Sequence, residues 1–118
     1  MNDIQKFEDL AAWQSGMELV QEIYGLTEKF PVDEKNGLTS QMRVTAIKIP
    51  SKIAASVGCN NLKITYWYLG IVHGLLHSLE TYLKTAVRLH YAPLLEAAPV
   101  MEKCKSLERM VSDLFHSS

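Results

Sequence analysis

Apolar residues recur with a helical period along the whole chain. Between residues 10 and 30 they stand three or four positions apart and form the series Leu10, Trp13, Met17, Val20, Tyr24. Such spacing places the apolar side chains on one face of a helix. The same spacing returns over residues 38–58, 62–91 and 93–116, and no strand-type alternation is present. The pattern therefore predicts an all-α protein with four helices.

Residues that end or begin helices separate these segments. Pro31 stops the first one, because the residue before a proline is pushed out of the helical region. Gly58 suits the C-terminal cap of the second helix, and Asn60 or Asn61 suits the N-terminal cap of the third. Pro93 suits the first turn of the fourth helix. Short connections of this kind favour antiparallel neighbours.

The expected architecture is therefore an antiparallel up-down-up-down four-helix bundle, a single domain over residues 1–118. Two prolines lie inside predicted helices. Pro50 should kink the second helix and free the carbonyl of Ala46, and Pro99 should bend or restart the fourth.

The third segment is apolar on too many sides for an ordinary bundle helix. An ordinary bundle helix needs an apolar arc of somewhat over 100° around its axis. The large apolar residues of this segment cover roughly twice that arc. A narrow polar strip and a stripe of small residues fill the remainder. The polar strip is formed by Tyr66, His73, His77, Glu80 and Lys84, and the stripe of small residues by Gly70, Gly74, Thr81 and Thr85. Glycines in the middle of a helix more often admit a close neighbour. The helix is either central, buried against three neighbours, or part of it is a subunit interface. We favour the interface and hence a homo-oligomer.

Charge is segregated along the chain. Residues 1–39 hold three basic and eight acidic residues, a net charge of −5, whereas residues 40–90 hold six basic residues and one acid, a net charge of +5. Residues 91–118 contribute −1. The opposed halves would suit head-to-tail contacts between identical copies, which close into rings.

One constellation resembles a metal site. His73, His77 and Glu80 have the spacing that brings them to one helix face, as a zinc site requires. The metalloprotease signature places a glutamate directly after the first histidine, where this chain has Gly74. Structural histidines are the commoner outcome, so no metal or cofactor is predicted. Glu80 is expected to pair with Lys84 one turn later, or across the bundle with Arg43.

The sequence contains no arrangement typical of an enzyme. It lacks a glycine-flanked serine elbow, a cysteine–histidine context and a phosphate-binding glycine loop. The start of the chain lacks the pattern of a secretory signal, and no apolar run approaches the ~20 residues of a membrane span. We expect a cytoplasmic protein with no membrane partner, in which Cys59 and Cys104 stay reduced.

The basic residues of the two middle helices are the remaining functional candidate. They could neutralise phosphates of RNA, with aromatic side chains near enough to stack on bases. The predicted nucleic-acid-binding residues are Arg43, Lys48, Lys52, Lys63, Lys84 and Arg88. The alternative is that these residues only solvate the surface and that the protein is an interaction scaffold without nucleic-acid binding. The sequence pI of 6.4 is low for a general nucleic-acid binder.

Several motifs resemble a known family. Its opening motif matches Phe7-Glu8-Asp9-Leu10 with Trp13-Gln14, and its later motifs match Gly37-Leu38-Thr39-Ser40-Gln41-Met42-Arg43, Ile49-Pro50-Ser51-x-Ile53-Ala54 and Gly74-x-Leu76-x-x-Leu79-Glu80-Thr81-x-Leu83. Over about residues 7–115 the chain is similar to the four-helix-bundle proteins encoded in 23S rRNA intervening sequences.

The resemblance implies a cytosolic four-helix bundle that assembles as a homopentamer. It also implies a relation to the accessory variability proteins of diversity-generating retroelements, which bind a reverse transcriptase and nucleic acid through basic surfaces. The chain departs from the family pattern at Val44, where a second basic residue is usual, and at Ala55-Ser56, where Glu-Gly is usual.

Overall fold

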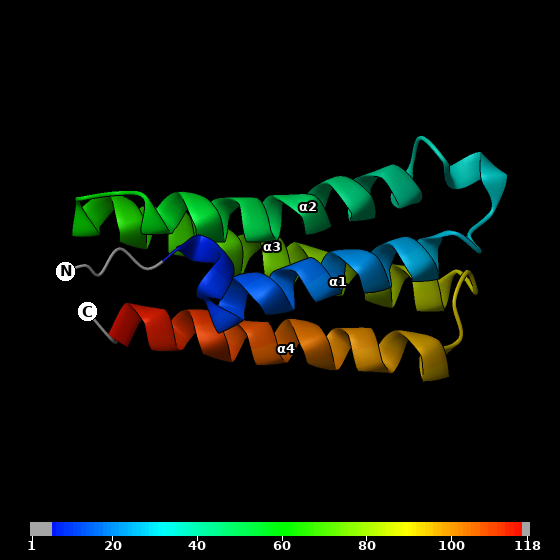
Figure 1. Ribbon diagram of the computed structural model, residues 1–118. Helices are drawn as coiled ribbons and strands as arrows, with labels where there is room; N and C mark the ends of the chain where they lie inside the picture. Colours follow the sequence, from blue (N-terminus) through cyan, green and yellow to red (C-terminus); the bar gives the residue numbers. More distant parts are fainter. Residues whose placement is uncertain (1–5, 117–118) are drawn as a thin grey trace.

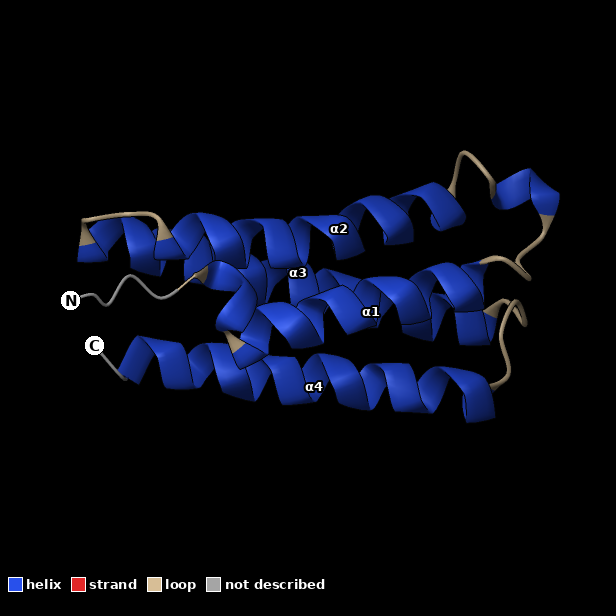
Figure 2. Ribbon diagram, viewed as in Figure 1, coloured by secondary structure: helices blue, strands red, loops and turns tan. Residues whose placement is uncertain are grey.

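The computed structural model describes residues 6–116, which form helices and connecting turns (Figures 1 and 2). Within this range four α-helices are present and no strand is found, so the predicted all-α fold is confirmed. Two short 3-10 helices accompany them. The elements are η1 (Phe7–Asp9), α1 (Ala11–Thr27), η2 (Val32–Glu34), α2 (Leu38–Val57), α3 (Leu62–Arg88) and α4 (Leu94–His116).

The helices run alternately up and down, as predicted (Figure 1). Contacts join α1 to α2, α2 to α3, α3 to α4, and α4 back to α1. Helix α3 therefore packs directly on two helices and lies diagonally from α1, so the alternative in which it is buried against three neighbours does not hold. The bundle measures 50 × 24 × 21 Å.

The core is built from the predicted apolar faces. Helical spacing brings one stripe of each helix to the centre, where the largest fully buried side chains are Leu19, Ile23, Met42, Ile49, Ile53, Leu69, Val72, Leu76, Leu79, Leu83, Leu107 and Val111. Burial of a side chain of this size stabilises the fold by about 1.5–3 kcal/mol. None of the helices formed by the described residues is long and apolar enough to cross a membrane.

The helix ends agree with several local signals. The side chain of Asn61 accepts hydrogen bonds from the backbone N–H groups of Lys63 (2.9 Å) and Ile64 (3.4 Å), so it is the N-terminal cap of α3. Gly58 caps the C-terminus of α2. These two predictions are confirmed. A helix cap depends on neighbouring residues alone, so the sequence is sufficient to predict it.

Two helices end three residues earlier than expected. Helix α1 stops at Thr27, before the Phe30-Pro31 pair, and α3 stops at Arg88. After α3 the chain adopts a left-handed conformation at His90, with φ of 63°. The N–H of Tyr91 then donates to the carbonyl of Ala86, and this hydrogen bond closes the end of the helix.

Both internal prolines lie within continuous helices. Pro50 is inside α2 and Pro99 is inside α4, so α4 does not restart at Pro99. Pro50 also marks a close approach to α1. A β-carbon added to the buried Gly16 would lie 3.3 Å from the β-carbon of Pro50, which is tighter than ordinary van der Waals contact.

Candidate nucleic-acid interface and the α3–α4 polar network

Arg43 is bound to α1. Its Nε donates to the hydroxyl of Thr27 at 2.9 Å, and one terminal nitrogen donates to the carbonyl of Tyr24 at 3.4 Å. The guanidinium carbon lies 4.4 Å from the centroid of the Tyr24 ring. The expected pairing of Arg43 with Glu80 across the bundle is therefore wrong.

Lys48 and Lys52 lie on a different side of α2. At about 100° per residue they stand about 140° and 180° around the helix from Arg43. The Nζ of Lys52 lies 5.9 Å from the ring centroid of Tyr68 on α3, so this side of α2 faces α3. The structure thus separates Arg43 from the two lysines with which it was grouped.

The three basic residues of α3 share one exposed sector. Lys63, Lys84 and Arg88 fall within about 60° around the helix, and all three are exposed. Lys63 and Lys84 are nonetheless about 30 Å apart along the axis. Lys84 and Arg88 line a shallow groove with Thr81 and Thr85 near the C-terminal end of α3. The cations therefore form a stripe along α3 rather than a cluster.

Small residues occupy the middle of this outer face. A β-carbon added at Gly70 or Gly74 would have no atom within 4 Å, so the close neighbour expected at these glycines is not part of the described chain. Nearer the start of α3, Leu62, Ile64 and Trp67 are exposed, and Trp67 keeps 62% of its surface accessible.

Part of the acidic charge is neutralised within the chain. Lys103 on α4 forms ion pairs with Glu18 and Glu22 of α1. The acidic field proposed for contacts between copies is therefore weaker than the sequence count indicates.

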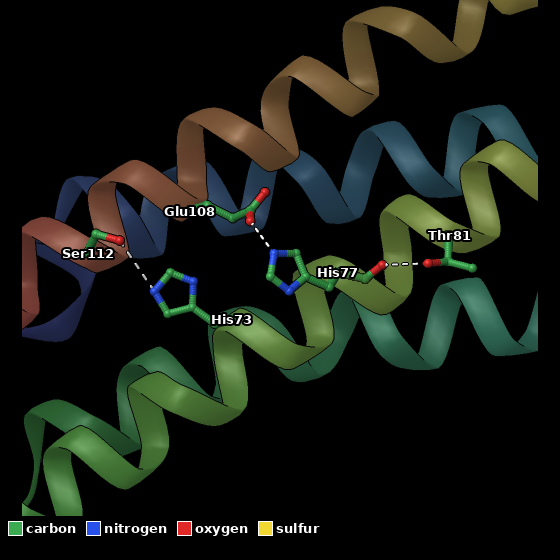
Figure 3. A network of polar contacts seen from close by, with 5 residues as sticks. All are labelled: His73, His77, Thr81, Glu108 and Ser112. Carbon is green, nitrogen blue, oxygen red and sulfur yellow. Dashed lines mark hydrogen bonds and ion pairs between the residues drawn. The ribbon is translucent and has the colours of Figure 1, made fainter.

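A polar network joins α3 to α4 (Figure 3). The Nε2 of His77 lies 2.7 Å from a carboxylate oxygen of Glu108. One turn earlier, the Nε2 of His73 lies 3.5 Å from the hydroxyl of Ser112, and its ring stacks on Phe115 with centroids 5.8 Å apart. The two histidines thus face different groups on α4.

Glu80 extends this network into the interior. Burial and the neighbouring carboxylate of Glu108, with which it shares a hydrogen bond, raise the pKa of Glu80 to about 7, although His77 and Lys105 act in the opposite direction. Its Oε2 is buried and has no hydrogen-bond partner among the described residues. One ligand atom each from His77, Glu80 and Glu108 lie within 4.8 Å of one another.

This set differs from the constellation read in the sequence. His73 is not part of it, and Glu108 replaces it. Glu108 lies 28 residues beyond Glu80, on another helix, and no local spacing points to it. Only the packing of α4 on α3 brings the second carboxylate to the first.

A comparison with family models matches residues 8–113 to the 23S rRNA-intervening sequence proteins. The chain belongs to this family. The match covers most of the sequence, and the predicted resemblance is confirmed. The description of the 23S rRNA-intervening sequence proteins names a genetic element and no reaction. No curated protein matches the chain.

Proposed function

We propose that this 23S rRNA-intervening sequence protein is a non-enzymatic, homo-oligomeric helical bundle that binds RNA through basic residues of α2 and α3. One observation carries the proposal. Glu80 is the only acid among residues 40–90, and it is turned toward Glu108 on α4. The outer sides of α2 and α3 therefore present cations without a competing carboxylate from the same segment.

The residues proposed to contact phosphates are not equivalent. Lys48, Lys63, Lys84 and Arg88 are exposed, whereas Lys52 and Arg43 are half-buried. Exposed lysine and arginine side chains can reach phosphates and release counterions. Because Arg43 is bound to Tyr24 and Thr27, its first role is structural, and it would contribute less to RNA affinity than the other five.

The outer face of α3 supports self-association. Exposed Trp67, which lies in the same sector of the helix as the two glycines, would be covered by a second copy, and Gly70 and Gly74 would let its backbone approach closely. The homopentamer implied by the family resemblance stays a prediction. A ring would repeat each basic stripe, so weak contacts to one RNA would add through multivalency.

Charge reversal tests this proposal. The variant carries Lys48→Glu with Lys52→Glu, and the matched control carries Lys6→Glu with Lys35→Glu, an equal charge change among the acidic first 39 residues. RNA affinity is measured at low salt and across a salt titration, and particle size is measured by light scattering.

We expect salt-dependent RNA binding by the wild type and the control, with loss of binding by the variant at unchanged particle size. Dissociation of the variant would instead support the alternative function, an interaction scaffold held together by charge. Absence of salt-dependent RNA binding by the wild type would refute RNA binding, and a monomer at micromolar concentration would refute self-association.

A further inference from the structure

The polar network between α3 and α4 contains the donor atoms of a metal site. His77 and Glu80 are three residues apart on α3, so both side chains leave the same face of that helix. Glu108 reaches them from α4 (Figure 3 shows it beside His77). One ligand atom from each side chain lies within 4.8 Å of the other two.

The network sets two carboxylates, those of Glu80 and Glu108, against the single imidazole of His77. The Oε2 of Glu80 is buried without a hydrogen-bond partner among the described residues. Lys105, whose charge also acts on Glu80, has its Nζ 3.7 Å from Glu102. Although Glu80 shares a hydrogen bond with Glu108, a buried oxygen without a partner is costly, and so is the proximity of two carboxylates. A cation between these three side chains would neutralise both carboxylates and pair the buried oxygen of Glu80.

We propose that His77, Glu80 and Glu108 bind a divalent metal ion that bridges α3 and α4, with zinc as the best-fitting ion. One imidazole nitrogen and two carboxylate oxygens are ligands that zinc accepts, with a fourth position left for water. Magnesium fits less well, because it prefers oxygen ligands in a near-octahedral arrangement and loses its water reluctantly. The inference is independent of RNA binding.

The site can accept the ion with small movements. Zinc holds nitrogen and oxygen ligands at about 2.0–2.2 Å in a tetrahedron, which places ligand atoms about 3.4 Å apart. His77 and Glu108, now 2.7 Å apart, would open slightly, and a pair at the 4.8 Å limit would close by about 1.4 Å. The side chain of His77 is 68% exposed, which lets the ion enter from solvent and lets the ring adjust. Binding would replace the contact between His77 and Glu108 with two bonds to one cation and would pair the buried oxygen of Glu80.

Equilibrium dialysis with Zn²⁺ at pH 7.5, after removal of bound metal by a chelator, tests the site. We expect one ion per chain. The variants His77→Gln, Glu80→Gln and Glu108→Gln should each weaken binding at least about tenfold, whereas His73→Gln and His90→Gln should leave it unchanged. Mg²⁺ should not bind at micromolar concentration.

A second readout distinguishes binding at this site from loss of folding. Zinc should raise the melting temperature of the wild type and of His73→Gln, but not that of His77→Gln, whose side chain is exposed and not part of the core. Substoichiometric binding, or equal zinc affinity in wild type and all three ligand variants, would mean an adventitious ion only and would overturn the proposal.

Discussion

The guanidinium of Arg43 on α2 stacks on the ring of Tyr24 on α1, with 4.4 Å between the guanidinium carbon and the ring centroid. The same side chain donates a hydrogen bond to Thr27, whose hydroxyl in turn donates to the carbonyl of Ile23 at 2.7 Å. Arg43 therefore joins the last turns of α1 to α2. A basic residue that the sequence presents as a phosphate ligand is in the structure a contact between two helices.

Arg43→Ala should lower the free energy of unfolding by about 1–2 kcal/mol. The change removes a cation–π contact and two hydrogen bonds at a half-buried position. Urea unfolding measures the difference. Lys48→Ala is the control, since Lys48 is exposed and its loss should cost no more than about 0.5 kcal/mol. Equal stability of the two variants would show that the Tyr24 contact contributes nothing.

Gly25 and Gly16 on α1 should respond in opposite ways to alanine. Gly25→Ala should stabilise the protein by about 0.5–1 kcal/mol, because alanine favours the helix and its methyl group meets no atom within 4 Å. At Gly16 the added methyl group would press on Pro50, so the same propensity gain should be offset or reversed. Thermal unfolding of the two variants provides the comparison. A gain at Gly16 equal to that at Gly25 would show that α1 and α2 have room to separate.

The two cysteines should differ in reactivity. Burial, together with the carboxylates of Glu80, Glu108 and Glu22, raises the pKa of the Cys104 thiol to about 12. Since the thiolate is the reactive form, Cys104 should not react in the folded protein at pH 8, whereas the half-buried Cys59 should.

A thiol-specific dye should therefore label one site per native chain and a second only after unfolding. In Cys59→Ser the native reaction should disappear, and in Cys104→Ala it should persist. Rapid labelling of Cys59→Ser in the folded state would contradict the burial of Cys104.

Glu34 should make stability depend on acid pH. Its carboxylate accepts hydrogen bonds from the backbone N–H of Leu38 at 2.9 Å and from the hydroxyl of Tyr91 at 2.7 Å. These bonds lower the pKa of Glu34 from its ordinary value of 4.5. The folded state thus binds the proton less tightly than the unfolded state, so the stabilisation is complete above pH 4.5 and is lost as the pH falls through the lowered pKa.

Glu34→Gln should accordingly be less stable than the wild type at pH 7, and the difference should shrink below pH 4.5. Melting temperatures recorded between about pH 3 and about pH 7 measure the effect. Glu28→Gln, a change at an exposed acid on the same connection, is the control. A difference that is constant over this range would show that the charge of Glu34 is not what stabilises the turn.

Local residues predicted much of the fold. Helical spacing gave the four helices, and the cap at Asn61 follows from one residue and the two N–H groups beyond it. The ends of α1 and α3 were placed three residues too far, because apolar spacing continues past the point where the chain turns. The left-handed conformation that ends α3 occurs at His90, and because this residue is not a glycine, the sequence does not predict it.

The sequence predicted the candidate sites only in part. The shared face of His77 and Glu80 follows from their spacing, but the inclusion of His73 was wrong, because that side chain meets Ser112 and Phe115 one turn away. The six basic residues are all present in the sequence, yet nothing in it separates Arg43 from the others. That separation depends on which side of α2 faces α1.

Sequence alone determined that this chain forms four amphipathic helices in antiparallel order, because helical periodicity and capping act between residues a few positions apart. Tertiary structure alone decided that Arg43 lies on Tyr24, that Glu80 meets Glu108, and that the other helices of the described chain leave the outer face of α3 exposed. These contacts depend on which helices are neighbours and on their rotation and offset. Those quantities are set by the packing of the whole core, and no short stretch of residues encodes them.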